Sequence, residues 1–203
     1  MNRIEALYAE RPDPAAFAGG YLEYVAEVLR ALDPEAIAAF IRELLEARER
    51  DARIYFLGNG GSAATASHFV NDISIGSKSW EKPFRAISLS DNSAVMTAIA
   101  NDSGYDEVFV QQLRFQLHPG DVVVAISVSG NSPNVLAAVE YAQATGARIV
   151  ALTGFDGGRL RELADVCVHV PTNHGEYGPA EDAHMVLDHL IGAFLGQLCR
   201  HEA

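Results

Sequence analysis

The chain has 203 residues, with 15 Lys and Arg against 27 Asp and Glu, which gives a formal charge of −12. Hydrophobic residues make up 49% of it, which is enough for a sizeable core and excludes a disordered chain. The negative charge argues against a nucleic-acid partner, and an aromatic content of 8% argues against a platform for stacked bases. We find no signal peptide and no membrane span, and Cys167 and Cys199 form no CxxC motif. We therefore expect a cytoplasmic protein with reduced thiols.

Residues 1–51 form an N-terminal segment with a helical pattern. Apolar residues recur at helical spacing between Tyr21 and Leu32, and again between Ile37 and Leu45. Asp33-Pro34 between them is typical of an N-cap followed by a first helical residue. Two helices that precede the first strand cannot be crossover helices, so we expect them to cover a sheet face or another subunit.

Residues 52–203 alternate short, apolar, β-branched stretches with helical patterns. This alternation predicts an α/β fold with a five-stranded parallel sheet flanked by helices, in a single domain spanning residues 1–203. The expected strands are Ile54–Leu57, Ala86–Leu89, Val122–Ile126, Ile149–Leu152 and Val166–Val170. The expected helices are Ser62–Ile75, Ser93–Ala100, Glu107–Leu117, Ser132–Thr145, a short turn near Arg159–Ala164 and a long helix from about Pro179 to Cys199.

Two loops at the carboxyl ends of predicted strands have the composition of anion-binding loops. Residues 58–63 read GNGGSA and open a helix, so their glycines permit close approach of backbone N–H groups to an anion. Residues 127–133 read SVSGNSP, in which Ser132 suits an N-cap and Pro133 the first helical position. Three serine hydroxyls would then surround an anion without any Lys or Arg.

Each loop alone is also compatible with an ordinary tight turn from a strand into a helix. The first loop further matches the dinucleotide pattern G-x-G-x-x-A, for which Asp91 is a candidate ribose ligand. No Lys follows its glycines, so it is not a Walker A loop. The second, serine-rich loop favours a single phosphomonoester over a dinucleotide.

A possible metal site is indicated by His68 and Asp72, which lie four residues apart and share one helix face. Such a pair is also commonly a simple hydrogen-bonded pair. The last predicted helix carries further candidate ligands, namely Glu181, Asp182, His184, Asp188 and His189.

Glu181 and His189 lie eight residues apart, which on a straight helix is a rise of about 12 Å. That distance is too long for two ligands of one ion. Three explanations remain open. Glu181 precedes the regular helix, neighbouring subunits contribute, or His184 is the partner of Glu181.

The motifs together resemble the SIS (sugar isomerase) domain family, and within it the sedoheptulose-7-phosphate isomerases, or phosphoheptose isomerases. The resemblance covers nearly the whole chain, including the two N-terminal helices. It is carried by GNGGSAATASHFVND (58–72), AISLSDNSAVMTAIANDSGYDEVF (86–109), PGDVVVAISVSGNSPNVLAA (119–138), LTGFDGGRL (152–160) and EDAHMVLDH (181–189).

This resemblance implies an aldose–ketose isomerase on a three-layer fold, usually a homotetramer with active sites between subunits. Matching positions imply Zn²⁺ held by His68, Asp72, Glu181 and His189, with Asp72 and His189 as the acid/base pair. The implied substrate-binding residues are Asn59, Gly60, Gly61, Ser62, Asn101, Asp102, Ser127, Val128, Ser129 and Ser132.

Three positions depart from the family pattern, which usually has Glu at 72, Gln at 181 and often Thr at 128. Asp72 is shorter than Glu by one C–C bond, roughly 1.5 Å. A displacement of that size can cost a proton-transfer group about 100-fold in rate. We therefore expect Asp72 to be a ligand and consider Glu181 as the catalytic base.

The leading hypothesis is conversion of sedoheptulose 7-phosphate to D-glycero-D-manno-heptose 7-phosphate through a metal-assisted cis-enediol. One alternative is an isomerase of a related seven- or eight-carbon sugar phosphate. Another is a non-catalytic SIS protein similar to the replication-initiator-associating protein, which would not need all four candidate ligands. A sugar-phosphate-sensing regulator is disfavoured because no DNA-binding segment is evident.

Overall fold

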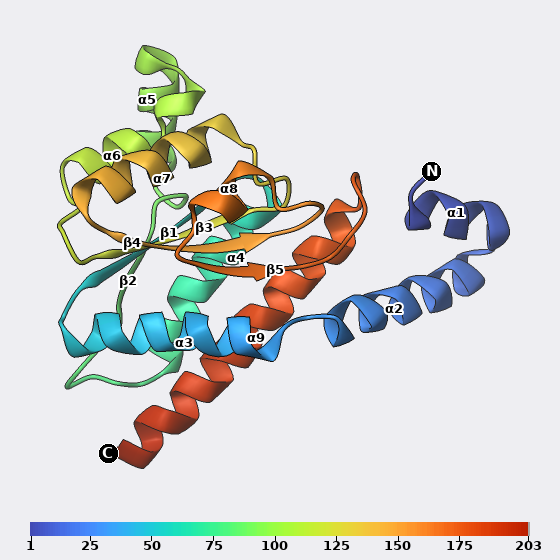
Figure 1. Ribbon diagram of the computed structural model, residues 1–203, viewed down its shortest axis with the longest axis horizontal. Coiled ribbons are helices and arrows are strands. Elements are labelled where there is room, and N and C mark those ends of the chain that lie inside the picture. The colour runs from blue at the N-terminus through green and yellow to red at the C-terminus, as the bar shows by residue number, and fades with distance from the viewer. Residues whose placement is uncertain (203) are drawn as a thin grey trace.

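The computed structural model describes residues 1–202 and is built around a parallel five-stranded sheet (Figure 1). The expected strands are confirmed to within one residue at either end. Their spatial order is β2-β1-β3-β4-β5, so the chain reverses its direction of travel across the sheet between β1 and β3. The strands are β1 (Arg53–Gly58), β2 (Arg85–Ser88), β3 (Val122–Ser127), β4 (Arg148–Thr153) and β5 (Val166–His169).

Helices cover both faces of the sheet and produce three layers, as Figure 1 shows for α3 and α9 on one side and α6 and α7 on the other. Alternate strand residues enter two separate cores, because successive side chains point to opposite faces. Phe56 and Val124 pack in the first core, whereas Tyr55 and Val123 pack in the second. The first core includes α3 (Pro34–Glu49), α4 (Gly61–Asn71) and α9 (Tyr177–Glu202), and the second includes α6 (Val110–Arg114), α7 (Pro133–Thr145) and α8 (Gly158–Leu163).

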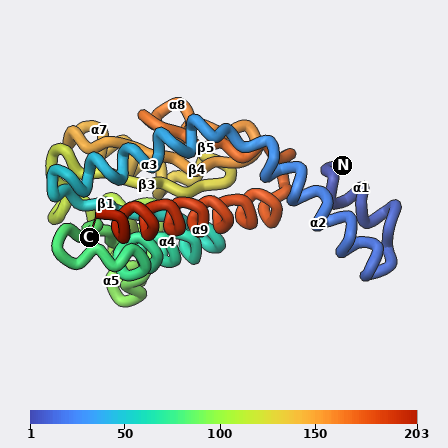
Figure 2. Tube along the Cα trace, turned by 90° about the horizontal axis from the view of Figure 1, so that it is seen from below, coloured from blue at the N-terminus to red at the C-terminus, as the bar shows by residue number. Residues whose placement is uncertain are grey.

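The N-terminal segment contains three helices rather than the two expected, because α1 (Arg3–Glu10) precedes α2 (Pro14–Arg30). Only α3 covers the sheet, whereas α1 and α2 extend beyond the sheet as an arm (Figures 1 and 2). The buried Glu176 joins this arm to the start of α9, since it accepts hydrogen bonds from the Tyr24 hydroxyl and from the Arg3 backbone N–H (2.6 Å).

The helix expected to run from residue 62 to residue 75 changes character partway. α4 ends at Asn71, and the wider π-helical turn η1 (Asp72–Gly76) follows it. Such π-turns frequently occur at functional sites, because the wider turn displaces side chains from the regular helical register.

The segment between β2 and α6 contains α5 (Ser93–Ser103) and the 3₁₀ turn η2 (Tyr105–Glu107). No residue of α5 is buried within the described chain, and Figure 1 shows the helix standing away from the sheet. Across residues 1–202, no helix is long and apolar enough to cross a membrane.

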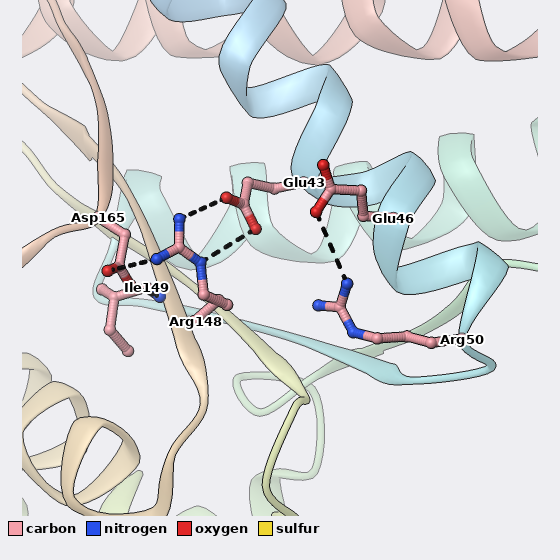
Figure 3. A network of polar contacts seen from close by, with 6 residues as sticks. All are labelled: Glu43, Glu46, Arg50, Arg148, Ile149 and Asp165. Atoms are coloured by element: carbon pink, nitrogen blue, oxygen red, sulfur yellow. Dashed lines mark hydrogen bonds and ion pairs between the residues drawn. The ribbon is translucent and has the colours of Figure 1, made fainter.

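Arg148 joins α3 to the edge of the sheet where the strands begin, at the end remote from their carboxyl termini (Figure 3). Its guanidinium donates to Glu43 Oε1 at 2.6 Å and to Asp165 Oδ1 at 2.6 Å. The other oxygen of Asp165 accepts the backbone N–H of Ile149 at 2.8 Å. Helix α3, β4 and the entry to β5 are therefore held by one network.

We expect Glu43→Gln to lower the free energy of unfolding by about 1 to 2 kcal/mol, because it removes the charge of the buried member of this ion pair. The half-exposed position of Arg148 keeps the loss below that of a fully buried pair. Urea unfolding at fixed protein concentration measures it.

The matched control is Glu46→Gln, which removes an exposed ion pair with Arg50 (Figure 3). A guanidinium nitrogen of Arg50 lies 4.0 Å from Glu46 Oε2 in that pair. Its effect should stay below about 0.5 kcal/mol. Equal losses from the two variants would contradict a special role for the Glu43–Arg148 pair.

Candidate functional site

The candidate site begins where β1 and β3 end side by side. In the parallel register Gly58 pairs with Ile126, so the loops that follow the two strands leave the sheet at neighbouring points. Because the chain continues to opposite sides of the sheet from this place, a crevice opens there, as is usual for ligand sites in open α/β sheets.

The first loop approaches its neighbours too closely for any side chain at residue 58. A Cβ on Gly58 would lie 2.7 Å from Ser62 Cβ and 2.9 Å from the Ile126 carbonyl oxygen. Gly60, at φ +54°, is the N-cap of α4 and has no side chain to occupy the first-turn N–H groups. The start of α4 therefore presents the backbone donors expected of an anion site.

The second loop contributes hydroxyls. Ser132 lies at the N-cap position of α7, but its Oγ faces Ser127 Oγ at 3.3 Å instead of an N–H group of the helix. Gly130 (φ +64°) crosses the backbone of Gly157 so closely that a Cβ would lie 1.9 Å from its carbonyl oxygen. The glycine thus allows the tight turn that gathers the serines.

Between the two loops lies a pocket of about 140 Å³. Within the described residues its lining contains no Lys or Arg, so an anion there would be bound by hydroxyl and N–H donors. The pocket is lined by Asn59, Ser62, Ile126, Ser127, Val128, Ser129, Ser132, Tyr177 and Glu181.

Asn134, which the sequence analysis did not single out, connects the two loops. Its buried amide exchanges two hydrogen bonds of 2.9 Å with the amide of Asn59. Asn59 Oδ1 also accepts the hydroxyl of Tyr105 at 2.9 Å. A polar side chain in the otherwise apolar first turn of α7 was the signal available in the sequence.

A second group of polar side chains lies where the end of α4 packs against α9. His68 and Asp72 come from α4 and η1, and Asp188 and His189 come from α9. Each of the four offers a ligand atom within 4.8 Å of the others, so together they could hold a metal ion.

Close packing of η1 on α9 depends on Gly192. A Cβ there would lie 3.3 Å from Asp72 Cβ, so the small residue lets Asp72 lie directly against the helix. His68 Nδ1 lies 2.5 Å from Asp188 Oδ2 and 3.8 Å from Asp72 Oδ2.

The chemistry of this group suits a cation. Asp188 is fully buried, and burial raises its pKa to about 6 despite the opposing effect of the hydrogen bond with His68. The same hydrogen bond raises the pKa of His68. Asp188 Oδ1 has no hydrogen-bond partner among residues 1–202. Two carboxylates and two imidazoles form a donor set that fits Zn²⁺ or a similar divalent ion.

His184 does not belong to this group. It is fully buried, its Nε2 lies 3.3 Å from the Thr153 carbonyl oxygen, and burial lowers its pKa to about 4. His189, rather than His184, is therefore the histidine of α9 that meets His68.

Glu181 also lies outside the group within this chain. α9 is already regular at Tyr177, so about 12 Å of helix rise separates Glu181 from His189. Its carboxylate lies over the start of α4, since a Cβ on Gly61 would come 2.4 Å from Glu181 Cδ. Burial, and secondarily the nearby Asp182, raise the pKa of Glu181. Of the three explanations for its spacing, a contribution between subunits is the one still open.

Two further predicted residues, Asn101 and Asp102, are exposed on α5. The amide of Asn101 donates to Asp102 Oδ1 at 2.8 Å, and neither residue lines the pocket. Asp91, the alternative ribose ligand, accepts hydrogen bonds from the hydroxyls of Ser67 and Ser88, so its carboxylate stabilises the protein itself.

Comparison with known proteins identifies the family of this chain. The SIS domain family matches residues 20–154. The phosphoheptose isomerase of Citrifermentans bemidjiense is 38% identical over 168 residues, which cover 81% of this chain and 86% of that protein.

Two solved phosphoheptose isomerases share the fold. The structure from Neisseria gonorrhoeae has a TM-score of 0.78 at 31% identity and covers 89% of this chain and 96% of that one. The structure from Francisella tularensis has a TM-score of 0.79 at 26% identity and covers 91% of this chain and 99% of that one. The chain therefore belongs to the phosphoheptose isomerase family of SIS-domain proteins, which are sugar-phosphate isomerases.

Proposed function

We propose that this protein interconverts sedoheptulose 7-phosphate and D-glycero-D-manno-heptose 7-phosphate with the help of a bound divalent ion, Zn²⁺. The observation that carries the proposal is the course of two adjacent helices. α4 begins at the pocket between the two loops and ends at the group formed by His68, Asp72, Asp188 and His189. α9 packs beside α4 and bears both Glu181 and His189 (Figure 2).

The separation of the two sites suits a long sugar phosphate. Ser62 lines the pocket and His68 lies six residues later, which corresponds to about 9 Å of helix rise. In an open-chain heptose 7-phosphate, five carbons separate the phosphate from the reacting C2. Binding of the phosphate by Ser127, Ser129 and Ser132 would then orient the reacting end.

Proton transfer between C1 and C2 requires a base for the carbon-bound proton and an acid for the carbonyl oxygen. His189 is the proposed acid, and Asp72 and Glu181 are the two candidate bases. His68, Asp72 and His189 would hold the ion. When bound, the ion supplies positive charge that stabilises negative charge on the sugar oxygens.

A homotetramer with sites between subunits would complete this arrangement. Such an assembly would bring Glu181 and the exposed Asn101 and Asp102 to the sites of neighbouring chains. An exposed apolar stripe on α9 supports association of this kind, and its members are Val186, Leu190 and Phe194.

The first prediction concerns activity and metal together. Metal-loaded protein should form aldose from sedoheptulose 7-phosphate, a chelator should abolish the reaction, and added Zn²⁺ should restore it. A coupled isomerisation assay measures all three.

Absence of turnover by the metal-loaded protein would contradict the proposal. A binding screen across phosphorylated sugars would then separate an isomerase of another seven- or eight-carbon substrate from a non-catalytic adaptor.

The second prediction concerns the base. If Glu181 takes the proton, Glu181→Gln should lower kcat by about 100-fold or more with little change in KM, because the amide cannot accept it. Steady-state kinetics measures both constants. The matched control is Asp182→Asn, whose carboxylate accepts a hydrogen bond from Tyr21 at 2.6 Å and does not line the pocket. If Glu181→Gln instead changed kcat and KM by similar factors, the base would be Asp72.

The third prediction concerns the phosphate pocket. Asn134→Asp should raise KM by about 10-fold, because it removes the donor that aligns Asn59 and links the two loops. Initial-rate kinetics beside a thermal unfolding curve checks it. A fall in kcat at unchanged KM would contradict a role in binding.

A further inference from the structure

We propose that Tyr177 is a further phosphate-binding residue, whose hydroxyl donates a hydrogen bond to the phosphate group of the substrate in the pocket between the two loops. This inference rests on the sugar-phosphate substrate of the proposed function and deepens it. It adds an aromatic donor to a pocket whose other hydroxyl donors are serines of the two loops.

Tyr177 reaches this pocket from a part of the chain outside both loops. It is the first residue of α9, and it lines the pocket together with Ser127, Ser129 and Ser132. Within the described residues the lining holds no Lys or Arg, so a phosphate there depends on uncharged donors. Each such donor matters, because a hydrogen bond to a charged group is stronger than one between neutral groups.

The ring of Tyr177 is held by Phe155, which follows β4. The two rings meet edge to face, with centroids 4.9 Å apart and an angle of 77° between their planes. Aromatic pairs in this arrangement are stabilising beyond the area that they bury. The ring of Tyr177 is therefore restrained even though the residue is about half exposed.

Phe155 itself has an unfavourable backbone conformation. Its φ is +52°, in the left-handed region that a bulky side chain rarely adopts. Its surroundings maintain this conformation, since Phe155 is buried and its backbone N–H donates to the Thr172 hydroxyl at 3.3 Å. Residues held in such conformations cluster at ligand sites, and here the strained residue places its ring against Tyr177.

The backbone of Tyr177 is restrained as well, because the preceding residue is the buried Glu176. The Glu176 carboxylate accepts hydrogen bonds from the Tyr24 hydroxyl and from the backbone N–H groups of Arg3 (2.6 Å) and Asn173 (2.8 Å). Both the ring and the backbone of Tyr177 are thus held in place before any ligand binds. A donor positioned in advance loses little conformational entropy when it binds a ligand.

The hydroxyl of Tyr177 is the part that the protein leaves unpaired. Among residues 1–202 it forms no hydrogen bond, whereas the hydroxyl of Tyr21 donates to Asp182 and that of Tyr105 donates to Asn59. A restrained ring with an unpaired hydroxyl at the wall of an anion pocket is typical of a residue that binds a ligand.

The test is binding of inorganic phosphate to the full chain, measured by isothermal titration calorimetry after metal removal so that phosphate cannot bind to the ion. Wild-type protein should bind phosphate. Tyr177→Phe should weaken this binding by about 10-fold or more, because it removes one hydrogen bond to a charged group and keeps the ring.

The matched control is Tyr8→Phe. Tyr8 is an exposed tyrosine on α1, and its ring also meets a phenylalanine, Phe17, edge to face. This variant should bind phosphate as the wild type does. Thermal unfolding of both variants should match that of the wild type, because each keeps its aromatic ring.

Steady-state kinetics with sedoheptulose 7-phosphate gives a second measurement. Tyr177→Phe should raise KM by a factor similar to its loss of phosphate affinity and leave kcat nearly unchanged, because the bond to phosphate is present in both the ground state and the transition state.

Unchanged phosphate affinity in Tyr177→Phe would overturn the inference, and a rise in KM alone would place the hydroxyl on the sugar instead. An equal loss in Tyr8→Phe, or no phosphate binding by the wild type, would also overturn it. Phosphate binding as expected without sugar turnover would leave the role of Tyr177 intact and contradict the proposed reaction alone.

Discussion

The parallel pairing of β1 with β3 is the constraint on which the candidate site depends. Their register brings Gly58 beside Ile126, and the two following loops then diverge into helices on opposite faces of the sheet. Any side chain at Gly58 would collide with Ile126 or Ser62, so the first loop can be this close to the second only with glycine. The reciprocal amide pair of Asn59 and Asn134 then holds the loops at a common spacing.

Packing of α4 on α9 creates the second feature. Gly192 lets Asp72 lie against α9, and the π-helical turn η1 begins at Asp72. The result is a group of two acids and two histidines in which one carboxylate is fully buried. A buried acid without a basic partner is unfavourable unless a cation shares the site, so the interface between these helices has the chemistry of a metal site.

The strongly acidic chain also shows how an anion can be recognised without bulk positive charge. Hydroxyls of Ser127, Ser129 and Ser132 and the first turns of two helices line the pocket, while Glu181 lies at its wall. Backbone and hydroxyl donors act over short distances, so they favour a ligand that fits the pocket rather than any passing polyanion.

Periodicity and motif spacing in the sequence determined the five strands, most of the helices, the two loops and the pairing of His68 with Asp72. These features depend on residues within a few positions of one another, where helical and extended geometry apply directly. The helix α1 was missed because it buries no residue and so carries no strong apolar pattern. The break from α4 into η1 has no local breaker residue before Gly76 and was missed for a similar reason.

Tertiary structure alone decided the strand order, the Asn59–Asn134 link, and the meeting of Asp188, rather than Glu181, with His68. His68 and Asp188 are 120 residues apart, and whether they touch depends on how α4 and α9 pack, which no local pattern encodes. Spacing showed that Glu181 and His189 were too far apart for one ion. Only the packing of two remote helices revealed which carboxylate lies beside the histidines.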